Sequence, residues 1–273
     1  MAIKAGILAF ASAVMAATLG AREVEFRCGA PEPDNELVSA HQAFAQAEAI
    51  SHPLEAKANI NVDTYIHVVV SDRSEDISDS TLAEQMQVLN DNYAASGFSF
   101  TLKGTDRTYN ANWARDGDEL AMKRKLRKGD YKTLNLYYLS DLGQNLGYCY
   151  FPTNASPGSY TFIRDGCSIL AASVPGGSAT NFNEGKTTTH EVGHWLGLFH
   201  TFQGGCRGAG DEVDDTPAQS SPTSGCPIGR DSCPAAGLDP IHNYMDYSYD
   251  SCYEEFTPGQ ATRMKSFFNR YRA

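Results

Sequence analysis

Residues 190–200 read His190-Glu191-Val192-Gly193-His194-Trp195-Leu196-Gly197-Leu198-Phe199-His200. Residues four apart in an α-helix lie one turn above each other on one face, so His190 and His194 would point two imidazoles at a single position. Imidazole nitrogen is a favoured zinc ligand, and a catalytic zinc takes three protein ligands and keeps one position for water. Glu191 directly follows the first histidine, so we expect its carboxylate to take a proton from that water as a general base.

The third ligand depends on a turn at Gly197. His200 lies six residues past His194 and would point away from the ligand face if the helix continued. Glycine adopts positive φ and commonly ends helices, so a turn at Gly197 would bring His200 to the metal. A bare His-Glu-x-x-His also arises by chance on amphipathic helices, but Gly197 and His200 at these offsets favour a zinc site. The whole pattern resembles the long zinc motif of metzincin proteases.

The composition limits the kinds of partner. The 273-residue chain is 41% hydrophobic, as is ordinary for a globular protein, and its formal net charge is −11. This charge argues against nucleic acid and against anionic membranes as partners, because both need a basic face. One dense basic run, Lys123-Arg124-Lys125 with Arg127 and Lys128, lies on an expected helix over residues 118–128. A solvated helix face explains it, with polyanion binding as the alternative.

The N-terminus has the pattern of a secretory signal. Lys4 gives it a positive start, residues 7–19 are mostly apolar, and small residues follow. The apolar stretch is too short to favour a membrane span. We therefore expect residues 1–20 to be a signal peptide and the protein to be secreted, in an oxidising compartment where cysteines pair.

Seven cysteines is an odd number, so one should remain unpaired. Cys28 is the natural candidate, because it stands alone ahead of a polar, helix-prone stretch over residues 37–58. Four of the other six follow the zinc motif: Cys206, Cys226, Cys233 and Cys252. Sequence alone leaves three possible pairings for these four.

Strand and helix patterns alternate ahead of the zinc motif, which predicts a mixed sheet with helices packed on it. The expected strands are 61–70, 98–102, 133–139, 148–151 and 167–174. One expected helix starts at a capping box formed by Thr81 and Glu84. Two further helices are expected over residues 118–128 and 184–198. After His200 the chain becomes irregular and needs its disulfides, and it closes with a helix capped by Thr257 and Gln260.

From Gly185 onward the chain resembles the pappalysin family of metzincins, in particular its secreted fungal branch. The matching segments include Gly185-Lys186-Thr187-Thr188-Thr189, Asp215-Thr216-Pro217, Gly225-Cys226-Pro227, Asp231-Ser232-Cys233-Pro234 and Asn243-Tyr244-Met245-Asp246-Tyr247. The resemblance is strong over residues 140–273 and weak before them. It implies a secreted zinc endopeptidase that acts on proteins or peptides, and we expect a monomer.

The resemblance also implies an architecture. The fold class is α+β: a mixed twisted sheet with two long helices above the cleft, then an irregular, disulfide-linked lower subdomain with a C-terminal helix. We expect a pro-segment at 21–58 and a catalytic domain at 59–273. The catalytic domain would divide into an upper subdomain (59–200) and a lower one (201–273).

The resemblance assigns roles to single residues. Met245 would form the hydrophobic floor beneath the zinc, although an ordinary core methionine is the alternative. Tyr247 would donate a hydrogen bond to the oxyanion of the scissile carbonyl, although a structural buried tyrosine remains open. Cys28 would be a latency switch whose thiolate fills the open zinc position.

The family implies the disulfides Cys206–Cys233 and Cys226–Cys252, and once these are carried over Cys149 and Cys167 are left to pair. It also implies a calcium site at Asp211, Asp214 and Thr216, although an acidic turn needs no metal. Asn154 begins an N-glycosylation site that Pro157 weakens. A catalytically silent zinc-binding protein on the same scaffold is the alternative function, and the intact Glu191 argues against it.

Overall fold

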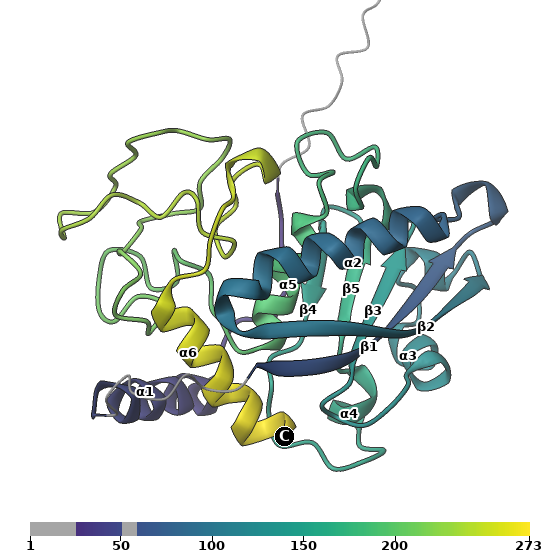
Figure 1. Cartoon of the computed structure of the whole chain (residues 1–273), viewed down its shortest axis with the longest axis horizontal. Coiled ribbons are helices and arrows are strands. Elements are labelled where there is room, and N and C mark those ends of the chain that lie inside the picture. The colour runs from purple at the N-terminus through teal and green to yellow at the C-terminus, as the bar shows by residue number, and fades with distance from the viewer. Residues whose placement is uncertain (1–25, 51–58) are drawn as a thin grey trace, which may run out of the picture.

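The computed structural model describes residues 26–50 and 59–273, and a five-stranded sheet of order β2-β1-β3-β5-β4 forms its centre (Figure 1). Four strands are parallel: β1 (Ile60–Val70), β2 (Phe98–Tyr109), β3 (Leu134–Leu139) and β5 (Cys167–Leu170). The short β4 (Gly147–Cys149) runs antiparallel along β5 at one edge. The expected mixed sheet is therefore confirmed. Strand β2 continues well past the expected end at residue 102, because it pairs with β1 along its whole length.

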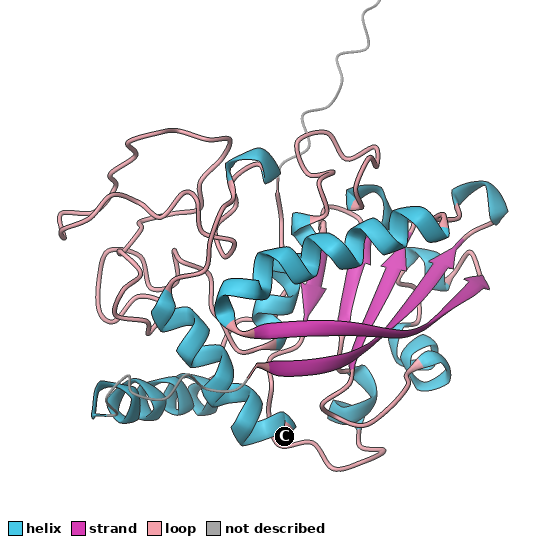
Figure 2. Cartoon of the chain, viewed as in Figure 1, coloured by secondary structure: helices cyan, strands magenta, loops and turns pink. Residues whose placement is uncertain are grey.

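Helices cover both faces of this sheet (Figure 2). Helices α2 (Asp79–Tyr93) and α5 (Lys186–Trp195) pack on one face and share the largest hydrophobic core with it. Helix α3 (Glu119–Leu126) packs on the other face and contacts the short α4 (Tyr160–Arg164). Strand β1 serves both cores, because Val68 and Val70 face α2 and α5 while Val69 faces α3.

Helix α2 starts at a different N-cap from the one expected, which was Thr81 in a capping box with Glu84. The N-cap is Ser78, whose side-chain oxygen accepts a hydrogen bond from the Thr81 amide at 3.1 Å. Thr81 already lies in the first turn, so the helix begins before the predicted position. Serine and threonine are both good N-caps, and here the earlier residue takes that role.

The basic run forms a solvated helix face only in part: Arg124, Lys125 and Lys128 are exposed as expected, but Lys123 is not. Lys123 is fully buried, pairs with Glu119 Oε1 at 2.7 Å and donates to the Arg164 carbonyl at 2.8 Å. Its ammonium lies over the rings of Tyr137, Tyr148 and Tyr150 at 4.9–5.3 Å. Burial lowers the pKa of Lys123. This lysine is thus a core residue that braces the strands next to the cleft, and it is not free to bind a polyanion.

The residues that follow the histidine motif, from 201 on, are mostly loop (Figure 2). They end in α6 (Pro258–Phe267), which continues as a short π-helical turn, Phe268–Arg272. Thr257 caps α6 in a capping box with Gln260, as expected. Two disulfides, Cys206–Cys233 and Cys226–Cys252, hold the loops, and Cys149–Cys167 joins β4 to β5. The first two are the pairs that the resemblance implied, and the third is the pair that was then left.

Part of the expected pro-segment is described. Residues 27–29 lie along the start of β4, and α1 (Asn35–Ile50) lies beside α6 (Figure 1). The expected signal peptide at 1–20 lies outside the described residues, as does the expected boundary at residue 58. Among the described residues, no helix has the length and apolar character that crossing a membrane requires.

Candidate active site

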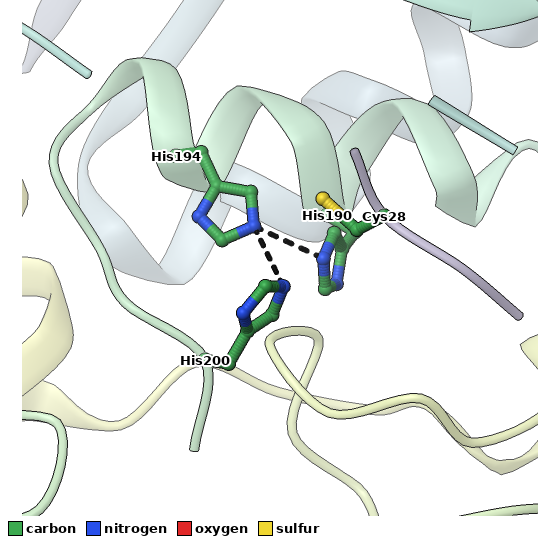
Figure 3. Close-up of side chains that lie close together, drawn as sticks. All are labelled: Cys28, His190, His194 and His200. Carbon is green, nitrogen blue, oxygen red and sulfur yellow. Dashed lines mark hydrogen bonds between the residues drawn. The ribbon is translucent and has the colours of Figure 1, made fainter. Parts of the chain in front are cut away.

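The three histidines of the motif meet at one point, as the spacing predicted (Figure 3). His190 and His194 lie on α5, which ends at Trp195. Gly197 then adopts φ +100°, and the Leu198 amide donates to the Gly193 carbonyl at 2.9 Å. An alanine at 197 would be doubly unfavourable, because its Cβ would also lie 2.5 Å from the Phe267 ring. The chain therefore reverses at Gly197 and brings His200 beneath the helix.

The orientation of the imidazoles suits a metal ion. The Nε2 atom of His194 lies 3.2 Å from that of His190 and 3.1 Å from that of His200. Tetrahedral zinc with Zn–N bonds of 2.0–2.1 Å needs such nitrogens about 3.3 Å apart. The Nδ1 atoms of His190 and His194 donate to the carbonyls of Tyr244 and Leu198, each at 2.7 Å. These bonds leave the Nε2 lone pairs free to bind a metal.

Cys28 completes the cluster as a fourth group. Its Sγ and the ring nitrogens of the three histidines all lie within 4.8 Å of one another. Cys28 takes part in no disulfide. Its segment is held on β4, because the Gly29 amide donates to the Gly147 carbonyl at 2.8 Å and the Leu146 amide donates to the Arg27 carbonyl at 2.8 Å. The odd cysteine of the sequence thus lies where a metal would need its fourth ligand.

Glu191 lies next to this cluster and is fully buried. Its Oε2 is 3.5 Å from Cys28 Sγ, and its Oε1 has no hydrogen-bond partner. Burial raises the pKa of Glu191 to about 8, against a smaller lowering by the bond from Cys28. Gly147 on β4 gives the carboxylate its room, because a Cβ there would lie 2.7 Å from Glu191 Cγ. The motif did not reveal Gly147, since the contact joins residues far apart in the chain.

Met245 and Tyr247 both lie against the cluster. Met245 is fully buried in a turn, and its sulfur packs against α5 at Gly193, where an added Cβ would lie 2.4 Å from it. The Tyr247 hydroxyl accepts a hydrogen bond from the Cys28 amide at 3.2 Å. Burial raises the pKa of Tyr247, so the phenol stays neutral and able to donate. Phe26 packs against both His190 and Tyr247, with ring centroids 4.8 and 4.7 Å away.

Comparison with known proteins shows the family of the chain. Residues 128–269 match the pregnancy-associated plasma protein-A family, the pappalysins. An extracellular metalloprotease of Colletotrichum graminicola is 59% identical over 98% of both chains. One of Pyricularia oryzae is 59% identical over 97% of this chain and 96% of its own. The chain belongs to the pappalysin family.

A solved structure of a related protease supports the family assignment. Mature mirolysin of Tannerella forsythia, in complex with a cleaved peptide, superposes with a TM-score of 0.63. It is 29% identical and covers 78% of this chain and 92% of its own. The protein is thus a metalloendopeptidase of the metzincin kind, and the family implies a catalytic metal at the cluster.

The helix α5 of this metalloprotease is fixed at its start by Asp250, which lies far along the chain. Asp250 Oδ2 accepts the backbone amide of Glu184 at 2.8 Å, and Lys186 Nζ donates to the Asp250 carbonyl at 2.7 Å. Asp250 is fully buried, and burial raises its pKa to about 7. On the other side, the Tyr93 hydroxyl of α2 donates to the Thr189 carbonyl at 2.9 Å. Segments that precede and follow the motif in the chain therefore hold α5 in place next to His190.

The remaining expected sites lie away from the cluster. Asp211 is buried and its Oδ1 accepts a hydrogen bond from the Val213 amide at 3.1 Å, while Asp214 is exposed. Neither belongs to the groups of three or more His, Cys, Asp or Glu that come close enough to hold a metal among the described residues. Asn154 is exposed in the loop between β4 and α4.

Proposed function

We propose that the protein is an extracellular zinc endopeptidase that cuts proteins or peptides, and that its precursor is held latent by Cys28. The observation that carries the proposal is the convergence of three Nε2 atoms beside the buried carboxylate of Glu191. The extracellular metalloprotease names of the fungal relatives and the cleaved peptide bound by mirolysin support it.

Zinc fits the donor set, because three neutral imidazoles would fill three of its four coordination positions and leave the fourth for water. A structural zinc site has four protein ligands and no such open position. When bound, zinc would acidify a water molecule and polarise the scissile carbonyl. Glu191 would accept a proton from the water and later pass it to the amine that leaves. Its carboxylate is buried beside the three Nε2 atoms, with Oε1 unpartnered, which places it to exchange a proton with that water.

Tyr247 would stabilise the negative charge that develops on the carbonyl oxygen. Its hydroxyl is neutral, buried and on the side of the cluster that faces Cys28. When the pro-segment leaves, the hydroxyl loses the hydrogen bond from the Cys28 amide and is free to turn toward substrate. Met245, packed against Gly193, would hold the helix that carries two of the ligands.

Latency would come from the Cys28 segment, which engages three parts of the site together. Its thiol lies at the cluster and against Glu191, and its amide donates to Tyr247. Its backbone also pairs with Gly147 at the start of β4. A thiolate is a strong zinc ligand, so Cys28 would exclude the water that catalysis needs. In the domain scheme, this segment belongs to residues 21–58 and the enzyme to 59–273.

We extend the proposal to two peripheral features. Calcium would bind at Asp211, Asp214 and Thr216, supported by the burial of the Asp211 carboxyl beside the Thr216 hydroxyl, with backbone carbonyls completing the oxygen ligands. Asn154 would carry a glycan in its exposed loop. The net charge of −11 supports a monomer without nucleic-acid or membrane partners.

The test is to incubate the protein, freed of its pro-segment, with a peptide library in the presence and absence of a chelator. Cleavage should require the metal. Glu191→Gln should keep zinc bound and lower turnover about 10²–10⁴-fold, because it removes the general base. Zinc binding without any cleavage by the wild-type protein would instead support the catalytically silent alternative.

A further inference from the structure

The pro-segment has a second contact with the protein, on the C-terminal helix (Figure 1). Helix α1 carries His41, Phe44 and Glu48 at i, i+3 and i+7, so the three side chains share one face. This face lies on α6 and on Phe199, the residue that precedes the third histidine. We call this surface of the catalytic domain, formed by Phe199, Arg263, Ser266 and Phe267, the α1-binding face.

Aromatic contacts make up its first part. The ring of His41 stacks on Phe199 with centroids 3.9 Å apart, and it lies 4.5 Å from the ring of Phe267. Phe44 meets Phe267 edge-on at 4.9 Å. His41 is fully buried, and its Nδ1 accepts a hydrogen bond from Arg263 Nη1 at 2.8 Å. Rings in this arrangement contribute binding free energy beyond the area that they bury.

An ion pair makes up the second part. Arg263 reaches Glu48 Oε2 through both Nε and Nη2, each at 3.1 Å, and the Ser266 hydroxyl donates to Glu48 Oε1 at 2.6 Å. The side chain of Arg263 is 2% exposed and that of Glu48 is 17% exposed. Charge-assisted bonds are strong when they are this well satisfied, and removal of one partner leaves the other charge buried and unpaired.

The two contacts of the pro-segment are separate. Between Cys28 and His41 the chain passes over a cavity of about 290 Å³. Residues of the pro-segment line one side of it, Pro31, Glu32, Asp34, Glu36 and Leu37, and residues from the loop after β4 line the other. The strand-like contact at β4 and the helical contact at α6 are therefore two distinct contacts with a cavity between them.

We propose that α1 is a helical ligand that holds the pro-segment on the α1-binding face by itself, so that a pro-segment severed from the catalytic domain stays bound and still delivers Cys28 to the site. This inference rests on the proposed function. Amphipathic helices that bind grooves carry their contact residues at i, i+3 and i+7, as α1 does with two aromatic rings and one carboxylate. Anchoring by α1 raises the effective concentration of Cys28 at the cluster. The α1 contact thus gives affinity, and the Cys28 contact blocks the site.

The experiment uses the full chain with a specific protease site in place of residues 51–58, cut after folding. Retention of the severed pro-segment is measured by size-exclusion chromatography over a dilution series. The chain carries Cys28→Ser and Glu191→Gln, so that neither the thiol nor self-digestion affects the result. In this background, Glu48→Gln and His41→Ala are compared with Glu36→Gln, which makes the same charge change at an exposed position of α1.

We expect the severed pro-segment to stay bound in the background chain and in Glu36→Gln. Its dissociation constant should rise roughly ten- to a hundredfold in Glu48→Gln, as expected for a lost charge-assisted bond, and also rise in His41→Ala. Release from the background chain at micromolar concentration, or equal retention in all four chains, would overturn the proposal. Peptide cleavage is measured separately with wild-type Cys28 and Glu191. Its absence after the pro-segment is removed would contradict the proposed function alone, because retention does not depend on turnover.

Discussion

Gly147→Ala should impair catalysis by moving the proposed base while leaving the metal ligands in place. An added Cβ would lie 2.7 Å from Glu191 Cγ and 2.8 Å from its Oε1. Ordinary carbon contacts need about 3.5 Å, so Glu191 must shift by roughly 1 Å. A misplacement of that size costs about 10²-fold in rate, which is about 2.7 kcal/mol of transition-state stabilisation. Gly147 lacks the positive φ that disfavours alanine, so the strand itself should tolerate the change.

The assay is kcat on a fluorogenic peptide for the enzyme freed of its pro-segment, together with zinc content and melting temperature. Gly104→Ala on β2 is the matched control, because its Cβ would meet nothing closer than 3.4 Å. In a Glu191→Ala background, Gly147→Ala should have almost no further effect, since the atoms it would strike are gone. A Gly147→Ala enzyme within threefold of wild-type kcat, or an equal loss in both backgrounds, would refute the reasoning.

Three further results are expected. His200→Ala should lower zinc content after dialysis, because one of three ligands is removed, and full occupancy measured by atomic absorption would exclude His200 from the site. Precursor carrying Cys28→Ser should cleave peptides without an activating protease, whereas inactive precursor with its zinc bound would contradict the switch. Burial raises the pKa of Asp211 to about 8, so its contribution to stability falls as pH rises from about 4 to 8. With calcium chelated, Asp211→Asn should therefore raise the melting temperature more at pH 8 than at pH 5, and an equal difference at both would argue against a protonated Asp211.

The sequence predicted the parts of the site that depend on local spacing. His190, His194 and Gly197 follow helical geometry and a single turn, and the position of His200 follows from them. The sheet could be anticipated because its strands are apolar and alternate with helices. Within the basic run, the burial of Lys123 could not be predicted, because it depends on Glu119 and on tyrosines from two strands that no local pattern brings together.

The shape of the site depends on contacts that sequence periodicity does not contain. Gly193 stands in the middle of the zinc helix, where alanine would favour the helix by about 1 kcal/mol. Its place is explained only by Met245, whose sulfur lies where the Cβ would be. Gly147 likewise leaves room for Glu191 from another strand. The histidines determine which metal chemistry is available, and the two glycines allow the methionine floor and the carboxylate to approach them. A substitution at either glycine would preserve every ligand and still change the site, which is why a motif search alone underestimates what this activity requires.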